Sequence, residues 1–276
     1  MAKQIGVHKL HGKVDDQSYY YSKNGGYQSR KINPGMSAAV KNSAAYANTR
    51  LNNAEFGACG ACAGAMIRPI TQRWRFILDS IATGKLVKAM KEAMAQDNTS
   101  AWGKRLIPQA QMAIIQDAFN AFSKNQVPSE IKSAIGDAVY YNSATQTIVV
   151  DDGVFLSPDM VQEYIAKGAS GMAVKAFAFT VTAPTISVSG EGYARPYSLL
   201  VELSSVENTE DFVSGGNCEL LSDGMQTNAP AILNDTSHFG GILVIMLPYK
   251  KVGTNVYTLQ ELCSAVWVPA KAGSPE

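Results

Sequence analysis

The sequence contains little cysteine for its length. Its four cysteines, Cys59, Cys62, Cys218 and Cys263, are few and widely spaced in a chain of 276 residues. A disulfide scaffold needs a denser set of cysteines in a shorter chain. The composition therefore excludes a small disulfide-stabilised fold, and an apolar fraction of 46% indicates a chain with a full hydrophobic core.

Long hydrophobic runs and charge are scarce as well. No stretch approaches the roughly 18 to 20 apolar residues of a membrane span, and the N-terminus lacks the apolar segment of a signal peptide, so we expect synthesis in the cytoplasm. Charged residues make up 17% of the chain and its net charge is +1, so no overall field attracts nucleic acid or an anionic membrane. Low charge with abundant small polar residues indicates a surface that is buried against partners.

Catalytic signatures are also missing, since neither a P-loop nor a Gly-x-Ser-x-Gly elbow occurs. Cys59 and Cys62 have the spacing of a redox Cys-x-x-Cys motif, but small residues surround them and no strand precedes them, so we interpret both as packing groups. His8 and His11 could complete a zinc site with them, although the spacing matches no common zinc finger. We interpret these histidines as solvated and predict no metal or cofactor.

Two polar loops invite a functional interpretation that their context does not support. Asp235, Ser237 and His238 lie in one turn, whereas a catalytic triad is assembled from separate elements around an oxyanion hole. The segment 190–195 resembles a phosphate-binding loop, but no helix follows it, so we predict a hairpin turn. The sequence therefore predicts no catalytic residue.

Residues 1–12 are predicted to form an irregular or extended arm, and the next segment a β-hairpin. Two aromatic-rich runs flank Asn24-Gly25, and both residues tolerate the positive φ that a type I′ turn requires. The runs contain four tyrosines: Tyr19, Tyr20, Tyr21 and Tyr27. A lone hairpin is marginal in water, so we expect these rings to cover a neighbouring subunit; stacking on bases or sugars is the alternative.

The segment after residue 56 is rich in very small side chains. If it is helical, Gly57, Gly60 and Gly64 share one face, which another helix or chain can approach closely. Each glycine disfavours a helix by roughly 0.8 to 1 kcal/mol relative to alanine, so contact with a partner is expected to stabilise the segment. Pro69 is predicted to kink this helix or to end it near Arg68.

Basic residues follow the glycines. A patch facing nucleic acid could form from this set: Arg50, Arg68, Arg73, Trp74 and Arg75. The interpretation we favour is a solvated helix face, or ion pairs between subunits. The predicted oligomer interface therefore comprises the four tyrosines, the three glycines, and Arg68, Arg73, Trp74 and Arg75.

Short segments rich in β-branched and aromatic residues dominate after residue 127. Their spacing predicts about seven to nine antiparallel strands in a β-sandwich. Gly241–Leu247 is apolar throughout and is predicted to be a central strand buried on both faces. The predicted fold is α+β, with an arm and hairpin over 1–35, a helical layer over 36–126 and an antiparallel sandwich over 127–276.

One pattern is recognisable over roughly residues 10–80. Gly12-Lys13-Val14 leads into an aromatic strand, a glycine-bearing turn and Tyr27-Gln28-Ser29-Arg30. An Asn/Ala/Arg-rich helix follows and ends in Glu55-Phe56-Gly57. A run of small residues then extends to Arg68-Pro69-Ile70. This pattern resembles the N-terminal part of a group of proteins from Bacteroidota and their phages that includes virion proteins of crAss-like phages. The resemblance implies a virion structural protein and carries over no catalytic residue.

The resemblance and the packing features together predict a non-enzymatic bacteriophage protein that assembles into a portal, neck or tail ring, as in a head-tail connector, or into a capsid auxiliary lattice. Its expected location is the virion. Expected partners are further copies of itself and other virion proteins, with nucleic acid met only as packaged or passing DNA and no membrane. Two alternatives stay open: a host-encoded β-sandwich module that binds carbohydrate or peptide, and a cysteine-dependent redox or metal protein.

Overall fold

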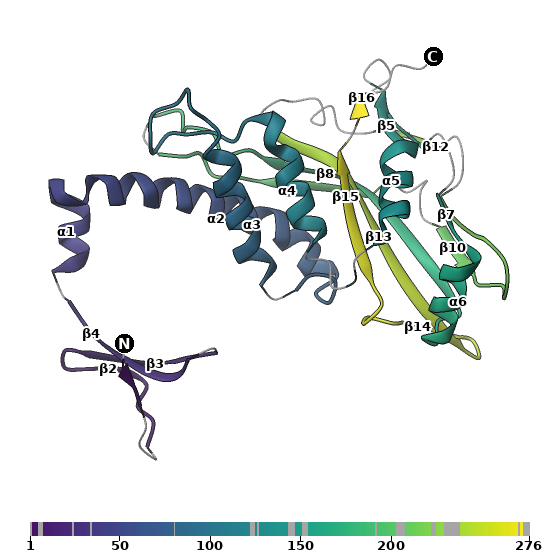
Figure 1. The fold of residues 1–276 in the computed structure, drawn as a ribbon, viewed down its shortest axis with the longest axis horizontal. Helices are drawn as coiled ribbons and strands as arrows, with labels where there is room; N and C mark the ends of the chain where they lie inside the picture. Colours follow the sequence, from purple (N-terminus) through teal and green to yellow (C-terminus); the bar gives the residue numbers. More distant parts are fainter. Residues whose placement is uncertain are drawn as a thin grey trace. The chain divides into compact units, whose positions relative to one another are not determined.

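A computed structural model of the chain confirms the predicted α+β class, with an N-terminal sheet, a helical region and a C-terminal antiparallel sheet (Figure 1). The structure describes residues 2–4, 8–23, 25–33, 35–79, 81–121, 125, 127–142, 147–150, 154–190, 192–202, 208–221, 225–228, 238–269 and 271–272. The chain divides into two units, residues 1–52 and 53–276. The division falls within helix α2, Ala47–Arg73, and each unit is described by itself.

The N-terminal unit contains a four-stranded antiparallel sheet in the order β1-β4-β3-β2. Its strands are β1 (Ala2–Lys3), β2 (Gly12–Val14), β3 (Gln17–Ser22) and β4 (Gly26–Lys31). The predicted hairpin is confirmed as β3 and β4, with Tyr21 opposite Tyr27 and a positive φ of 68° at Gly26. Asn24 of the predicted turn lies outside the described residues.

Within the predicted irregular or extended arm over residues 1–12, Ala2–Lys3 are extended and form strand β1 on the open edge of β4. The backbone N–H of Gln4 extends this pairing by donating to the carbonyl of Tyr27 at 3.0 Å. A β-strand edge has unpaired backbone groups, so the first residues gain hydrogen bonds by pairing there.

The same unit continues with helix α1 (Met36–Asn42), the 3-10 turn η1 (Ala44–Tyr46) and the start of α2. Arg50 donates from Nη1 to the carbonyls of Val40 and Ser43, each at 2.9 Å, and so ties α2 to the end of α1. None of the side chains described in residues 1–52 is buried. The N-terminal unit therefore has no hydrophobic core of its own in the described residues.

Helix α2 runs through Pro69 to Arg73, so of the two predicted effects of Pro69 the end of the helix near Arg68 is wrong. Proline removes one backbone hydrogen bond from a helix. Here Met66 and Ile70, on either side of Pro69, are fully buried, and their packing stabilises the last turn.

Two helices, α3 (Ala82–Met94) and α4 (Met112–Asn120), follow α2, and the 3-10 turn η2 (Gln109–Gln111) precedes α4. The helical spacing of apolar residues over 85–96 and the proline at position 108 predict a helix in each place, and α3 and α4 confirm both. The side chains of Leu86, Met90 and Phe119 are fully buried in the core.

Two further helices lie within the predominantly β region, α5 (Ser129–Ala138) and α6 (Pro158–Ala166). Helix α6 has Ser157 at its N-cap position and begins at Pro158, two residue types that are typical of a helix start. The expectation of strands from residue 127 is wrong over α5, where Ile131, Ile135 and Ala138 have helical spacing and are buried.

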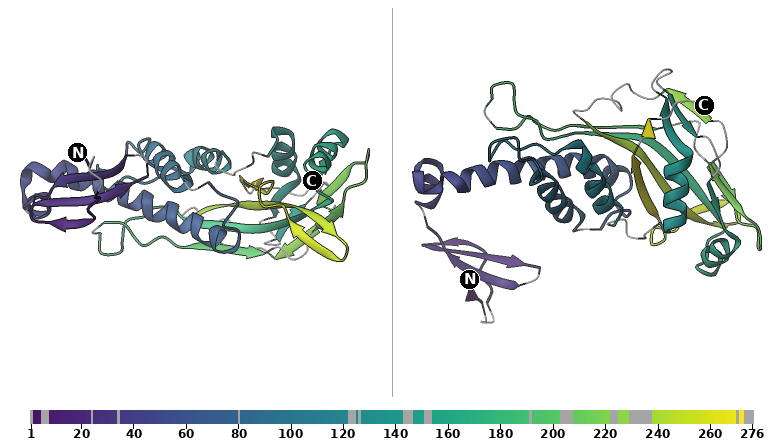
Figure 2. Two further views of the ribbon diagram at one scale, coloured as in Figure 1. Left: turned by 90° about the horizontal axis from the view of Figure 1, so that it is seen from below. Right: turned by 45° about the horizontal axis from the view of Figure 1, so that its top comes forward.

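The principal strands of the C-terminal unit form a six-stranded antiparallel sheet. Its members are β8 (Gly171–Thr182), β9 (Ser198–Glu202), β10 (Asn208–Asp211), β13 (His238–Val252), β14 (Asn255–Thr258) and β15 (Ser264–Pro269). Strands β8 and β13 pair over twelve residues and lie side by side in the centre of this sheet (Figure 1). The sheet is curved, as two other views show (Figure 2). The prediction of a buried central strand at Gly241–Leu247 is confirmed, since every residue of it is buried in β13.

Smaller sheets complete the unit. One is two-stranded and pairs β7 (Val154–Leu156) with β11 (Cys218–Leu221). The other is four-stranded, with the strand order β12-β6-β5-β16. Its strands are β5 (Val139–Asn142), β6 (Thr147–Val150), β12 (Met225–Asn228) and β16 (Lys271–Ala272). Strands β5 and β6 pair as an antiparallel hairpin, and residues 143–146 between them lie outside the described residues.

Alternate side chains of the large sheet enter two separate hydrophobic clusters. Phe177, Leu243 and Trp267 pack with side chains of α2, α3 and α4. Their neighbours Ala178 and Val244 pack with α5, α6 and the β7–β11 ribbon. The layers that cover the sheet are thus mainly helical rather than a second large sheet, because the apolar stripes of five helices are available to bury its faces.

Candidate interface on helix α2 and the Arg68–Arg195 cleft

Helix α2 turns its larger apolar side chains to the core and its glycines away from it. Cys59, Cys62 and Met66 are fully buried. On the opposite face Gly57 is exposed, and Gly60 and Gly64 are half-buried. The predicted glycine face therefore exists, and the core-facing side of the same helix is the one that carries the thiols.

Among the described residues, no packing contact requires glycine at these positions. A Cβ atom added at Gly57, Gly60 or Gly64 would meet no described atom within 4 Å. Alanine would favour the helix by about 0.8 to 1 kcal/mol at each position. The close approach predicted for this face is thus not made by the described residues of the same chain, and the face is open to another molecule.

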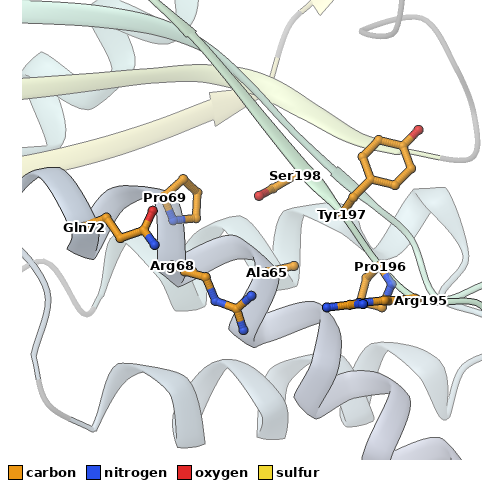
Figure 3. A pocket seen from close by; sticks show the side chains of 8 residues that line it. All are labelled: Ala65, Arg68, Pro69, Gln72, Arg195, Pro196, Tyr197 and Ser198. Carbon is orange, nitrogen blue, oxygen red and sulfur yellow. The ribbon is translucent and has the colours of Figure 1, made fainter.

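A cleft lies at the C-terminal end of this face. It has a volume of about 440 Å³, and its lining combines the last turns of α2 with the segment that enters β9: Ala65, Arg68, Pro69, Gln72, Arg195, Pro196, Tyr197 and Ser198. Figure 3 shows the guanidinium groups of Arg68 and Arg195 pointing toward one another across it. The cleft therefore brings together two cations from distant parts of the sequence.

Both arginines are exposed, and neither forms an ion pair with another described residue. Two facing guanidinium groups repel one another, and a carboxylate or phosphate placed between them relieves the repulsion through charge-assisted hydrogen bonds. The segment that carries Arg195 is held in place, because the N–H and hydroxyl of Thr182 donate to the carbonyl of Tyr197 at 2.9 and 3.0 Å. The arrangement is suited to binding an anionic group.

An exposed aromatic residue marks the other end of the helix face. Phe56 is 58% exposed and borders a groove of about 410 Å³ between α2 and α3, lined by Gly84, Val87, Lys88, Lys91, Glu92 and Ala95. Exposed aromatic rings are typical anchors at protein interfaces. The outward face of α2 thus combines an apolar anchor, a surface of minimal volume and a cationic cleft.

Helix α2 is held by a buried carboxylate. The Glu55 side chain is fully buried and accepts hydrogen bonds from Arg105, from Lys91 and from the backbone N–H of Gly103. Burial alone would raise the pKa of Glu55, but these donors outweigh it and lower the pKa to about 2. The ionised carboxylate thereby joins α2 to α3 and to the loop that precedes α4.

The paired cysteines belong to the core. Cys62 donates from Sγ to the carbonyl of Thr182 at 3.3 Å, and burial raises the pKa of Cys59 to about 11 and that of Cys62 to about 12. Burial therefore favours the protonated thiols, and both side chains lie in the hydrophobic core, in agreement with their interpretation as packing groups. Among the residues that the structure describes, no three His, Cys, Asp or Glu side chains lie close enough to hold a metal ion.

The remaining basic residues predicted for the interface are dispersed. Trp74 is half-buried and contacts Phe177 edge to face, with ring centroids 5.1 Å apart, so its ring packs on the chain's own core. Arg73 lies over the Trp74 ring, and Arg75 is exposed in the following turn. Arg50 is engaged by backbone carbonyls of the N-terminal unit, so Arg68 is the one member of the predicted basic set that lines the cleft.

The predicted tyrosines share the N-terminal sheet but not one face of it. The register places Tyr21 and Tyr27 directly opposite each other, with ring centroids 5.1 Å apart, and strand alternation puts Tyr19 on their side. Tyr20 lies on the other side, where its hydroxyl donates to Gln28 at 3.2 Å. Tyr21 and Tyr27 are exposed.

Sequence reasoning missed Arg195 and Phe56 as site residues. Arg195 follows a hairpin in which Ile186 is bridged to Tyr193, and residue 191 of the predicted turn lies outside the described residues. No local pattern indicates that this turn reaches α2. Phe56 had a usable signal, because it is a large apolar residue on the glycine side of the helix, away from Cys59 and Cys62.

The polar turn at 234–237 lies outside the described residues, and within the described part of the chain no helix has both the length and the apolarity to cross a membrane. Comparison of the chain with protein-family models, with curated proteins and with solved structures gave no match.

Proposed function

We propose that this chain is a structural subunit of a homo-oligomeric assembly, and that the assembly is a virion component such as a portal, neck or tail ring or a capsid auxiliary lattice. The observation that carries the proposal is the open glycine face of α2. Its three glycines weaken the helix and serve no contact among the described residues. A neighbouring copy packed on this face would account for them.

The Arg68–Arg195 cleft fits the same role. An acidic side chain from a neighbouring copy would be bound between the two guanidinium groups and would fix the register of the subunits. Because this face differs from the surface it would contact, the interface is heterologous, and rotational symmetry closes such contacts into a ring.

The N-terminal unit supports assembly independently. It has no buried side chain in its described part, and it exposes five large apolar side chains: Leu10, Val14, Tyr21, Tyr27 and Met36. A small sheet without a core is marginal in water. Packing of its tyrosine side against another subunit would supply the missing apolar burial.

The virion setting comes from the resemblance of residues 10–80 to proteins of Bacteroidota phages. The rival is a host-encoded module that binds a carbohydrate or peptide, for which the cleft beside Tyr197 and Pro196 would be the binding site. A cysteine-dependent redox role has less support, because both thiols of the pair are buried.

Sedimentation velocity of the purified chain over a range of concentrations tests the proposal. The wild type is expected to form one large species, and Gly60→Leu or Gly64→Leu to yield monomers with thermal stability no lower than that of the wild-type subunit, because open space surrounds both positions and leucine favours the helix. Gly136→Leu is the matched control, since Gly136 is another half-buried helical glycine with an open Cβ position, on α5.

A wild-type monomer at every concentration would contradict the proposal, as would leucine variants that assemble like the wild type. If that monomer bound a glycan or peptide and Arg195→Ala abolished the binding, the rival would be supported. Electron microscopy of the assembled species would give its symmetry, and labelling of particles would test the virion location.

A further inference from the structure

Positive charge is concentrated in the N-terminal unit. Residues 1–52 contain eight lysines and arginines against two aspartates and no glutamate, a net charge of +6. The remaining residues contain 16 basic and 21 acidic residues, a net charge of −5. The overall charge of +1 therefore hides a strongly basic N-terminal unit.

Half of these cations line one pocket of the unit. The pocket has a volume of about 600 Å³ and lies between strands β2 to β4 and helix α1; its basic side chains are Lys13, Arg30, Lys31 and Lys41. Hydroxyl and amide groups of Ser18, Ser37 and Asn33 also line it. The pocket thus combines cations with neutral hydrogen-bond donors, and it has no acidic residue in its lining.

The strand register explains how the cations gather. Lys13 is opposite Ser18, and Ser18 is opposite Arg30, so all three project from one side of the sheet. That side is opposite to the one formed by Tyr21 and Tyr27. The unit therefore has an aromatic side, suited to packing on protein, and a basic side that faces the pocket.

The charges in the pocket are largely uncompensated. Lys31 lies 3.5 Å from Asp16, and Arg30 lies 5.8 Å from the centre of the Tyr20 ring. Lys13 and Lys41 are exposed and form no ion pair with another described residue. The pocket therefore has an excess of positive charge that a bound polyanion would neutralise.

Seven of the 21 acidic residues of the C-terminal unit are already engaged within that unit. Many are already paired with lysines of their own unit: Glu92 with Lys88, Asp117 with Lys132, Glu163 with Lys167, Glu202 with Lys175, and Asp211 with Lys251. Glu55 is buried and Asp97 accepts four local hydrogen bonds. The excess positive charge of the pocket is matched by an external polyanion.

We propose that the basic pocket of the N-terminal unit binds the phosphodiester backbone of nucleic acid, without base readout, through Lys13, Arg30 and Lys41. Phosphate contacts by lysine and arginine release condensed counterions, so the binding is expected to weaken steeply as salt increases. The Tyr20 ring beside Arg30 places an aromatic surface at the same site, which suits stacking on a base of a single strand. This activity is independent of self-assembly.

Fluorescence anisotropy with short labelled DNA, single-stranded and duplex, tests the proposal on the full chain. Lys13→Gln with Lys41→Gln removes two charges from the pocket, and Lys3→Gln with Lys23→Gln removes two from elsewhere in the same unit. The pocket variant is expected to weaken binding more than about tenfold at low salt and to reduce the log–log salt slope on duplex DNA by about 2, and the control pair to have a much smaller effect.

If both double variants weakened DNA binding equally, the pocket would not be the binding site, because net charge alone would then drive binding. Absence of DNA binding by the wild type at low salt would overturn the proposal outright. If the pocket variant also lost self-association while the wild type failed to bind DNA, the partner would be an acidic surface of a second copy. Unchanged circular dichroism and thermal stability of both variants verify that they are folded.

Discussion

Glu55 and Arg105 form a two-point ion pair at a buried position, with Nε of Arg105 2.8 Å from Oε1 of Glu55 and Nη2 2.7 Å from Oε2. The pair fastens the loop before α4 to helix α2, just before the first glycine of the open face. The helix that we propose as the assembly surface is thereby held rigidly on its core side.

Glu55→Gln is expected to lower the free energy of unfolding by about 3 kcal/mol, because removal of one partner of a buried pair leaves the others uncompensated. Urea denaturation measures this change. Glu92→Gln serves as the control, since Glu92 forms only an exposed pair with Lys88 and its loss is expected to cost less than about 0.5 kcal/mol. Equal effects of the two substitutions would contradict the role of Glu55.

Stability should fall in acid. Glu55 has an ordinary pKa of 4.5 and a folded-state pKa of about 2, so its stabilising effect is complete above pH 4.5 and is lost as the pH falls toward 2. Asp97 acts in the same direction, because hydrogen bonds from Leu106, Ser100 and Thr99 lower its pKa. Unfolding free energies measured across this range should decline, and more gently in Glu55→Gln; parallel curves would rule Glu55 out as a cause.

Gly64→Ala is expected to raise the free energy of unfolding by about 0.8 to 1 kcal/mol, because alanine favours the helix and its Cβ meets no described atom within 4 Å. Thermal denaturation of dissociated protein measures the effect. A loss of stability would mean that the position is packed within the subunit, and the glycine face would then not be open.

A glycine-to-alanine substitution in the central strand β13 should instead lower the free energy of unfolding. A Cβ at Gly241 would lie within 3 Å of the carbonyl oxygen of Val268 and of Nε1 of Trp267, both on the neighbouring strand β15. Gly241→Ala is expected to cost about 2 kcal/mol or more, since a close-packed sheet cannot make room cheaply. A neutral result in denaturant titration would refute this packing.

The thiols should be unreactive in the folded protein. All four cysteines are free and buried, and burial raises the pKa of Cys59 to about 11 and that of Cys263 to about 12. A thiol reagent such as Ellman's reagent is expected to react at mildly alkaline pH only as fast as the protein opens, and to titrate all four after denaturation. Rapid reaction of Cys59 or Cys62 in the native state would revive the redox hypothesis.

Local sequence patterns were sufficient for many elements. The tyrosine-rich hairpin, the helix α3 and the buried strand in β13 are all where the sequence predicts them. In each case either the hydrophobic period or a turn-forming pair is strong and local, so neighbours along the chain contain the information. The helix α5 was missed because its apolar residues are few, although they have helical spacing.

The sequence by itself determined that α2 has a face of minimal volume, because the spacing of Gly57, Gly60 and Gly64 follows from helix geometry alone. Only the tertiary structure decided which side of α2 is covered. Cysteine, alanine and glycine differ too little in size and polarity to orient a helix, so the side that packs was set by Met66 and Ile70 against the sheet. Tertiary folding likewise decided that Arg195 faces Arg68, because contacts between distant segments depend on the path of the whole chain.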